Sequence, residues 1–192
     1  MEPPRLVYIV TGNEGKFREA SRILGEYGIE ARQARLVKVE IQSDRLEDIA
    51  LKAARIAYVQ LRRPLIVEDA GLFIDSLRGF PGPYSDYVYR TIGIEGILNL
   101  LQGRGRSACF RSAVAYVAPM AEKVFSGEVC GRIAEEPRGS EGFGFDPIFI
   151  PEGYSQTFAE LGIGVKNRVS HRAQALRKLA SWLVGAAHTG GW

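Results

Sequence analysis

Cysteine is scarce in this sequence, because only Cys109 and Cys130 occur among its 192 residues. The two do not form a C-x-x-C pair and no cluster of histidines lies near them, which argues against a zinc site and against thiol redox chemistry. A chain of this length can bury about 70% of its unfolded surface, so it needs no disulfide to fold. We therefore expect two free cysteines that are buried as small apolar side chains.

Long apolar runs are also missing. The only early run, Leu6–Val10, is too short for a signal peptide or a membrane span. A composition of 46% hydrophobic and 24% charged residues is typical of a soluble globular protein. We expect a cytoplasmic protein without a membrane partner, folded as one domain over residues 1–185 and ending in a frayed tail at 186–192.

A strong charge of one sign is absent too, since the net charge is only +3. This charge is too small to indicate a nucleic-acid partner. Its distribution is uneven, because no acidic residue follows Glu160. The basic residues in this last part of the chain include Lys166, Arg168, Arg172, Arg177 and Lys178. They form either a solvated helix face or a surface that faces an anion, and the sequence leaves both possibilities open.

Hydrophobic periodicity predicts a strand, a loop and a helix at the start of the chain. Leu6–Val10 is the strand, and apolar residues then recur at helical spacing until Gly28. A second helix begins near Asp44, whose carboxylate can cap it while Glu47 completes a capping box, and it ends before Pro64.

The next predicted strand is Leu65–Val67, which brings Glu68 and Asp69 to its carboxyl end, where open α/β sheets commonly bind ligands. Further elements follow in the second half: one or two helices over 84–101 broken near Gly93, extended segments over 107–117 and 123–133 joined by a hairpin, a strand at 148–150, and a last helix capped by Ser170. The pattern predicts a single mixed α/β domain.

The loop after the first strand contains the residues Thr11, Gly12, Asn13, Glu14, Gly15 and Lys16. Unpaired amides at a helix start carry partial positive charge that suits phosphate oxygens. The glycines permit close backbone approach, and Lys16 adds a full positive charge. The segment lacks the G-x-x-x-x-G-K-[ST] pattern, so it is not a Walker loop. By itself, it is either a phosphate-binding loop or an ordinary structural turn.

Three carboxylates are candidate ligands of a hard cation: Glu40, Glu68 and Asp69. Magnesium prefers such oxygens and bridges substrate phosphates. Glu40 alone could equally be an exposed loop charge. Glu68 and Asp69 are adjacent and follow an apolar strand, so burying them without a cation or donors would be costly. Because neighbours in a strand point to opposite faces, the two should have different roles.

Later motifs combine aromatic rings with charged groups. Gly142–Pro147 contains Phe143, Gly144, Phe145 and Asp146, and Ser170-His171-Arg172 follows further along. Two rings beside an aspartate suit a heterocyclic base, although either ring could instead belong to the core.

These motifs, in their order, resemble the inosine/xanthosine triphosphate pyrophosphatases of the Ham1 family. The matching pieces are Thr11-Gly12-Asn13 with Lys16, Glu40-Ile41-Gln42, Val67–Leu72, Pro81–Ser85, Gly142–Pro147, Lys166-Asn167 and Ser170-His171-Arg172. The resemblance implies an α/β fold with a long twisted mixed sheet and two lobes around a central cleft, as in the Maf and Ham1 proteins, and a homodimer. It also implies Mg²⁺-dependent hydrolysis of ITP, dITP and XTP to the monophosphate and pyrophosphate.

Residue roles follow from the same resemblance. Asp69 is implied as the catalytic carboxylate and a metal ligand, Glu40 as a second ligand, and Glu68 as a group that orients water or a lysine. Hypoxanthine and xanthine present a 6-keto acceptor and an N1 hydrogen, so Arg172 could donate to O6 and Asp146 accept from N1. Phe143 is expected to stack on the base and Phe145 to pack beneath it. Lys166 and His171 complete the implied pocket.

This sequence departs from the family pattern at two places. Many relatives have serine or threonine after the catalytic aspartate, where this chain has Ala70, so a backbone amide or a water would have to replace the hydroxyl. Ser85 follows the pattern, but Asp86-Tyr87 then replaces Ala-Arg. Ser85 is accordingly either a phosphate contact or a simple helix cap.

Two other functions remain open on the sequence. The basic C-terminal helix and the aromatic residues also fit a nucleotide- or RNA-binding module without turnover, although the three carboxylates would repel phosphate. A Maf-like pyrophosphatase acting on other nucleotides is the second alternative.

Overall fold

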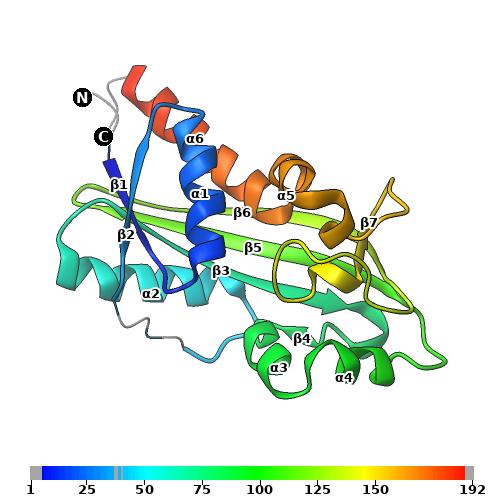
Figure 1. Cartoon of the computed structure of the whole chain (residues 1–192). Helices are drawn as coiled ribbons and strands as arrows, with labels where there is room; N and C mark the ends of the chain where they lie inside the picture. The colour runs from blue at the N-terminus through cyan, green and yellow to red at the C-terminus, as the bar shows by residue number, and fades with distance from the viewer. Residues whose placement is uncertain (1–5, 37–38, 40, 189–192) are drawn as a thin grey trace.

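The computed structural model describes residues 6–36, 39 and 41–188 of the chain. They form a seven-stranded sheet in the order β2-β1-β3-β5-β6-β7, with the short β4 paired to β3 (Figure 1). The strands are β1 Leu6–Val10, β2 Glu30–Ala34, β3 Leu65–Ile74, β4 Pro81–Gly82, β5 Ser107–Ala118, β6 Ala121–Ile133 and β7 Phe149–Pro151. Parallel pairing of β1 with β2 and β3 combines with antiparallel pairing elsewhere. The predicted mixed α/β fold is confirmed.

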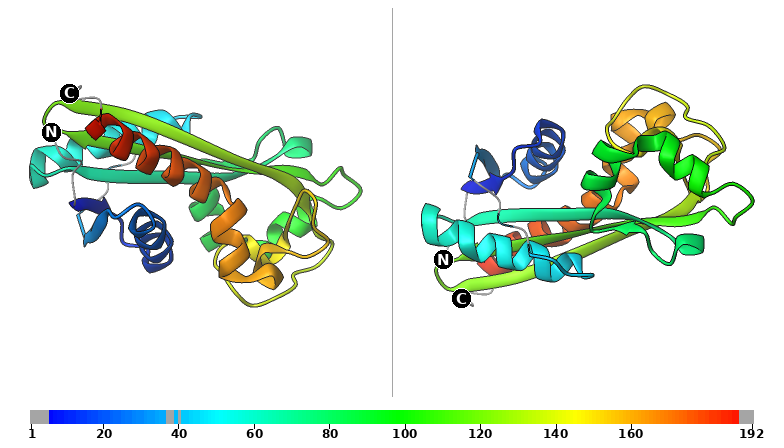
Figure 2. Two further views of the ribbon diagram at one scale, coloured as in Figure 1. Left: turned by 90° about the horizontal axis from the view of Figure 1, so that it is seen from above. Right: turned by 90° about the horizontal axis from the view of Figure 1, so that it is seen from below.

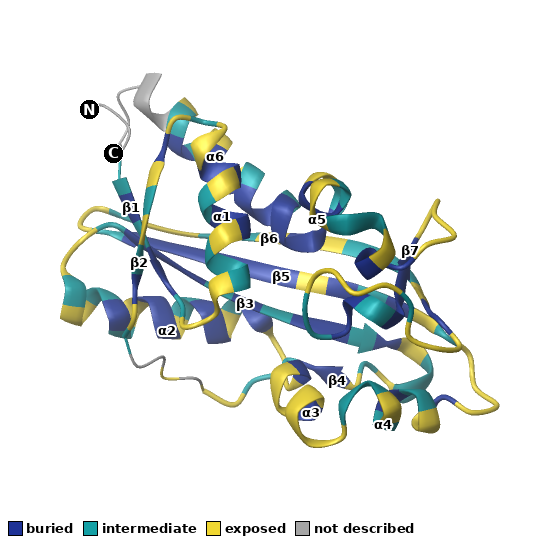
Figure 3. Cartoon of the chain, in the orientation of Figure 1, coloured by how far each residue is buried: buried dark blue, intermediate teal, exposed yellow. Residues whose placement is uncertain are grey.

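Helices cover both faces of the sheet. They are α1 Glu14–Gly25, α2 Leu46–Leu61, α3 Ser85–Thr91, α4 Gly93–Leu100, α5 Phe158–Val169 and α6 His171–His188, with short 3₁₀ turns η1 Asp75–Leu77 and η2 Asp146–Ile148. Helices α1 and α6 share one apolar core with β1, while α2 packs on the opposite face (Figure 2). A third core lies among α3, α4, β7 and α5. Buried side chains therefore follow β3 and β5 through the molecule (Figure 3).

Strand β3 is longer than the sequence predicts. It continues to Ile74, so Glu68 and Asp69 lie in the middle of the strand and not at its carboxyl end. The expectation was wrong because β5 pairs with β3 along its whole length, from Leu65 to Ile74. A continuous antiparallel partner satisfies the backbone, so two charged residues do not end the strand.

The other edge of β3 is only partly covered. Strand β1 pairs with it at Leu65 and Ile66, and β4 pairs with it at Leu72 and Phe73. Between these two partners, no described strand pairs with that edge over residues 67–71. The position of Glu68 and Asp69 beside this gap, and not a strand end, is what brings them to a cavity.

The start of α2 also differs from the prediction. The helix begins at Leu46 with Arg45 in the N-cap position, where no side chain caps it. Glu47 accepts a hydrogen bond from the hydroxyl of Ser126 on β6 instead of completing a capping box at Asp44. A partner distant in sequence therefore outcompetes the local cap. The helix ends at Leu61, before Pro64, as predicted.

The two cysteines are joined and not free, contrary to the prediction. Cys109 and Cys130 form a disulfide and lie opposite one another in the register of β5 and β6. Both are partly exposed. A separation of 21 residues hides this pairing in the sequence, whereas the hairpin register brings the two side chains face to face.

Several other elements agree with the sequence pattern. The 84–101 region forms two helices that meet at Gly93, and the β5–β6 hairpin turns at 119–120. Ser170 Oγ accepts from the Ala173 amide at the start of α6. Helix α6 continues to His188, beyond the expected start of the tail, and residues 189–192 lie outside the described part. No helix in the described residues is long and apolar enough to cross a membrane.

Candidate active site

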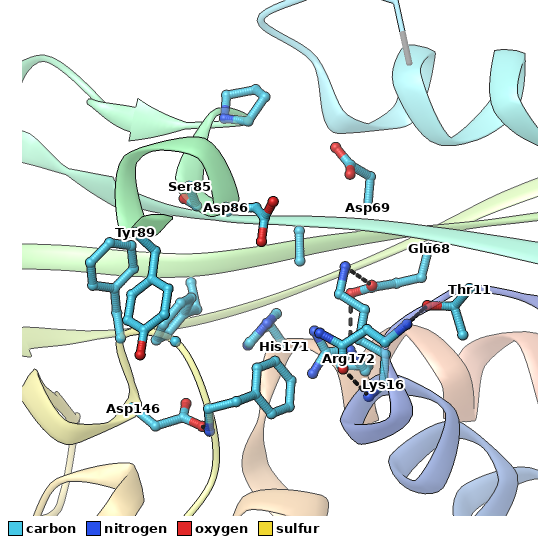
Figure 4. Close-up of a pocket in the computed structure, with 18 of the residues that line it drawn as sticks. Thr11, Lys16, Glu68, Asp69, Ser85, Asp86, Tyr89, Asp146, His171 and Arg172 are labelled. Atoms are coloured by element: carbon cyan, nitrogen blue, oxygen red, sulfur yellow. Dashed lines mark hydrogen bonds and ion pairs between the residues drawn. The ribbon is translucent and has the colours of Figure 1, made fainter. Parts of the chain in front are cut away.

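A cavity of about 450 Å³ lies beside the uncovered edge of β3, between the start of α1, the start of α6, helix α3 and the 142–146 loop (Figure 4). It gathers most of the residues singled out in the sequence. Those that line it are Thr11, Gly12, Asn13, Lys16, Glu68, Asp69, Ala70, Ser85, Phe143, Gly144, Phe145, Asp146, Lys166, His171 and Arg172. Glu14 and Gly15 are not among its lining residues, and Glu40 lies outside the described residues.

The loop before α1 is organised by its own side chains. Asn13 Oδ1 accepts from the Lys16 amide at 3.0 Å, and Thr11 Oγ1 accepts from the Asn13 amide at 3.0 Å. Asn13 is therefore the N-cap of α1. Glu14 points away from the cavity lining and pairs with Arg35 at 2.5 Å. The loop thus presents the start of a 12-residue helix to the cavity, with its partial positive charge.

Gly15 is required by a close approach. A Cβ atom added there would lie 2.9 Å from two ring carbons of Phe143. The 142–146 loop therefore touches the first turn of α1, and a side chain at position 15 would push the two apart.

A buried ion-pair network forms one side of the cavity. We use this name for Lys16, Glu19, Glu68, Asp146, Lys166 and Arg172. Arg172 pairs with Glu19 at 2.5 Å and with Glu68 at 3.0 Å, and Lys16 pairs with Glu68 at 2.8 Å. Lys166 pairs with Asp146 at 2.6 Å and with Glu19 at 3.1 Å. Three carboxylates thus match three cations.

Glu19 was missed by the sequence reasoning. It is 2% exposed and connects two of the three cations of the network. A signal existed, because Glu19 lies one helical turn after Lys16 and beside Ala20 on the apolar face of α1. A carboxylate on such a face requires a partner.

The network sets the protonation of its carboxylates. Burial alone would raise the pKa of Glu68, but Arg172 and Lys16 lower it well below its ordinary value. Burial would likewise raise the pKa of Glu19, but Arg172 and Lys166 lower it. At Asp146 burial prevails over Lys166 and the pKa is raised. The pKa of Arg172 is raised by Glu68 and Glu19, against the effect of burial.

The glycine-rich 142–146 loop holds the carboxylate of Asp146 in position. Its Oδ2 accepts from the Phe143 amide at 2.8 Å. Gly142 has a φ of +84°, and a Cβ there would lie 2.2 Å from the same oxygen, so only glycine fits. Phe143 lies beneath two cations, with the Lys166 ammonium 4.2 Å and the Arg172 guanidinium 5.3 Å from its ring centroid.

His171 lies in the floor of the cavity. Its ring stacks on Phe110 at 4.9 Å between centroids. The residue is 3% exposed, and its Nδ1 atom has no hydrogen-bond partner among the described residues. Burial, followed by Arg172, lowers the pKa of His171 well below 6.5, so the ring is neutral near pH 7. A buried neutral imidazole facing a cavity can either donate to a ligand or accept from it.

Glu68 and Asp69 leave β3 in opposite directions, as the alternation of a strand requires (Figure 4). Glu68 contacts Lys16, Arg172 and the hydroxyl of Ser112. Asp69 is 7% exposed and points to the other face, together with Val67, which packs against α2. The two carboxylates therefore have different surroundings, and Glu68 is the one enclosed by cations.

Ala70 offers its main chain to the cavity. The Pro64 carbonyl accepts from Tyr8 on β1, and the Leu72 amide donates to Ser85 Oγ at 2.8 Å, so both residues face the same edge of β3. Alternate residues of a strand direct their N–H and C=O groups to one edge. By this parity the main-chain groups of Glu68 and Ala70 face the uncovered gap.

Helix α3 forms the side of the cavity opposite the network. Ser85 is buried, and its hydroxyl accepts from Leu72 and donates to the Gly82 carbonyl at 2.7 Å. It therefore ties α3 to β3 and β4. Asp86 and Tyr89 line the cavity from the same helix, and sequence reasoning assigned them no role there. For Tyr89, the spacing of four residues from Ser85 is a signal in the sequence, because residues four apart lie on one helix face.

Comparison with known proteins agrees with this arrangement. The model of the Ham1 family matches residues 7–182. A dITP/XTP pyrophosphatase of Methanopyrus kandleri is 57% identical over 178 residues, covering 92% of this chain and 95% of the relative. A dITP/XTP pyrophosphatase of Saccharolobus solfataricus is 52% identical over 176 residues, covering 91% and 92%.

A solved structure leads to the same family. The structure of a HAM1 protein from Coxiella burnetii is similar with a TM-score of 0.81 and 30% identity, covering 94% of this chain and 98% of that one. Sequence, fold and the gathering of the motifs around one cavity agree. The chain belongs to the Ham1 family.

Proposed function

We propose that this protein hydrolyses non-standard purine nucleoside triphosphates (ITP, dITP and XTP) to the monophosphate and pyrophosphate. The observation that carries the proposal is the gathering of a helix N-terminus, carboxylates and aromatic residues around one cavity of about 450 Å³. Relatives named dITP/XTP pyrophosphatases that are about half identical to this chain support the substrate class.

The end of the cavity at Thr11 and Lys16 suits the triphosphate. The first-turn amides of α1 and the ammonium of Lys16 both favour anionic oxygens. The uncovered main-chain groups of β3 lie beside them. Lys16 is held by Glu68, so its ammonium group is positioned before substrate arrives.

A divalent cation fits the charge balance of the site. The three cations of the ion-pair network are already matched by three carboxylates, so a bound triphosphate needs further positive charge. Asp69 offers carboxylate oxygen, the ligand type that Mg²⁺ prefers. We assign Asp69 and Glu40 as its ligands, and not Glu68, whose oxygens face Lys16, Arg172 and Ser112. When bound, Mg²⁺ offsets charge on the phosphates and lowers the pKa of coordinated water.

The reaction is an in-line attack of water on the α-phosphorus, with pyrophosphate as the leaving group. Asp69 accepts the proton of the attacking water. Lys16 offsets negative charge that develops on the leaving group. No covalent intermediate is required, because the described part of the cavity contains no serine or cysteine paired with a histidine base.

The end of the cavity at Asp146 and His171 suits the base. Arg172 can donate to the 6-keto oxygen, and Asp146 can accept from N1–H. Both are already held by charged partners, so their hydrogen-bonding directions are fixed without substrate. A site of this polarity leaves groups unpaired against adenine, which can discriminate by about 10⁴-fold.

The RNA-binding alternative is disfavoured by the burial of two of the C-terminal basic residues, whereas Arg168 and Lys178 are exposed and Arg177 is half-buried. Lys166 and Arg172 are buried in the ion-pair network and do not lie on an outer surface. No specific observation favours a Maf-like preference for other bases. The homodimer and the cytoplasmic location implied by the family belong to the proposal, and light scattering of the purified protein tests the first of them.

The decisive experiment is a panel of nucleoside triphosphates assayed for pyrophosphate with and without Mg²⁺. We expect pyrophosphate and monophosphate from ITP, dITP and XTP, little product from ATP, and loss of turnover in EDTA that added Mg²⁺ restores. Release of orthophosphate only, or equal turnover of ATP and ITP, would contradict the proposal.

A further inference from the structure

The aromatic wall of the base pocket is incomplete if Phe143 is its only ring. Phe143 is the ring expected to stack on the base, yet the cationic groups of Lys166 and Arg172 lie over it. Its edge also rests against Gly15. Phe145 is only 3% exposed, so its face is not available as a stacking surface. Phe110 and His171 also line the cavity, but they stack on one another and are only 8% and 3% exposed, so a further exposed ring would complete the wall.

Tyr89 is placed to supply that ring. It lines the cavity from α3 and is 41% exposed. Its ring meets Phe145 edge to face, with centroids 5.4 Å apart and an interplanar angle of 88°. The contact with the buried Phe145 ring helps to fix the orientation of the Tyr89 ring.

The anchoring of α3 fixes where Tyr89 points. Ser85 ties the first turn of the helix to Leu72 and Gly82 through its hydroxyl. Val88 is buried in the core among α3, α4 and β7. Tyr89 lies one helical turn after Ser85 and therefore shares its face. Tyr87, on the same helix, is 62% exposed and does not line the cavity.

The position of Tyr89 along the cavity identifies what it would contact. In Figure 4, Tyr89 and Asp146 lie at one end, and Thr11, Lys16 and Glu68 lie at the other. The second end carries the helix N-terminus and suits phosphate. The first end carries the carboxylate assigned to the base edge. A ring at the first end meets the base and not the phosphates.

We propose that Tyr89 is a specificity-determining residue that forms a wall of the base slot and packs its ring against the purine. The inference deepens the function proposed above and rests on it. The ring provides contact area for a bicyclic base, which a single-ring pyrimidine would fill less well. The hydroxyl is secondary, because the contact is made by the ring.

The experiment compares Tyr89→Leu, which keeps an apolar cover on Phe145, with Tyr89→Phe, which keeps the ring. We expect Tyr89→Leu to raise KM for ITP about tenfold or more, the range lost when a base loses an aromatic partner. Its kcat should change by less than about threefold, because the reacting atoms lie at the other end. Tyr89→Phe and the matched control Tyr87→Leu should stay within about twofold of the parent.

Tripolyphosphate, which has no base, separates the two ends of the cavity. Its inhibition constant should be the same for the parent and Tyr89→Leu. An unchanged KM for ITP in Tyr89→Leu, or an equal weakening of ITP and tripolyphosphate, would overturn the inference. If the parent does not turn over ITP at all, the function proposed above fails. The same variants then test Tyr89 through the Kd of ITP, so the two failures are distinguishable.

Discussion

The two sides of the cavity are built by different means. The ion-pair network joins long charged side chains from α1, β3, the 142–146 loop, α5 and α6, and nearly all of them are buried. The α3 side is held by the hydroxyl of Ser85 and by apolar contacts, and its cavity-lining residues Asp86 and Tyr89 are exposed. Losing any member of the network unbalances its three buried carboxylates and three cations. Hydrogen-bonding polarity is therefore fixed on one side, while the other side can vary its shape at lower cost.

The largest effect is expected at Asp69, which lies between the two sides. Asp69→Asn keeps the size of the side chain but removes the proposed proton acceptor and one proposed cation ligand. We expect kcat for ITP to fall by about 10³-fold or more. Asp75→Asn, an exposed carboxylate just beyond the end of β3, serves as the control and should retain activity. Substantial turnover by Asp69→Asn would remove it from the chemistry.

The next effect tests the network as a unit. Arg172→Met leaves three buried carboxylates with only two cations, Lys16 and Lys166, and an uncompensated buried charge of this kind costs about 3–5 kcal/mol. Denaturant unfolding measures this loss. The exposed Lys178→Met on the same helix should cost less than about 1 kcal/mol. Equal stability of both variants would mean that the network does not hold the cavity together.

A smaller effect is expected on the α3 side. Ser85→Ala leaves the Leu72 amide and the Gly82 carbonyl without their hydroxyl partner, at a cost of about 1–3 kcal/mol. The variant should also raise KM for ITP, because α3 carries Tyr89. Ser181→Ala, on the exposed face of α6, is the control. A variant as stable as the parent would show that α3 is held by its apolar contacts alone.

The smallest and most gradual effect is expected from pH. The pKa of Glu68 and Glu19 is lower in the folded state than their ordinary 4.5, and the pKa of His171 is lower than 6.5. Groups of this kind take up protons more readily when unfolded, so they stabilise the fold above their ordinary pKa and lose that contribution as pH falls. Unfolding free energy should therefore decline from pH 6.5 downward, and again below 4.5, where the raised pKa of Asp146 opposes part of the decline.

His171→Gln should flatten the decline between pH 6.5 and 5 and leave the acidic part unchanged. Glu122→Gln removes a carboxylate whose pKa is also lowered, by Arg55, but at the surface. Because solvent screens surface pairs, this control should leave the profile close to that of the parent. A profile of His171→Gln that overlays the parent would contradict the assigned cause.

Much of the site was predictable because its residues lie in short local motifs. Asn13 to Lys16, Phe143 to Asp146 and His171-Arg172 are each contiguous, and each identifies a piece of the cavity without knowledge of the fold. Glu19, Asp86 and Tyr89 were missed because each acts from a helix face whose neighbours come from other parts of the chain. Periodicity shows that a face exists, but it does not show what the face meets.

The fold errors have one common cause, which is pairing between distant segments. Strand β3 continues through Glu68 and Asp69 because β5 lies beside it. Cys109 meets Cys130 because the hairpin register aligns them. Glu47 binds Ser126 of β6 in place of a local cap. Such contacts depend on register, which local propensity does not determine.

The uncovered edge of β3 between β1 and β4 gives the proposed substrate contact at position 70 a main-chain form that alanine can supply. The donors and acceptors along that edge belong to the peptide groups, and they remain whatever side chain evolution places there. Losing a hydroxyl removes one polar atom while the array itself persists. A receptor surface made of peptide bonds can therefore be inherited without being encoded by any particular side chain.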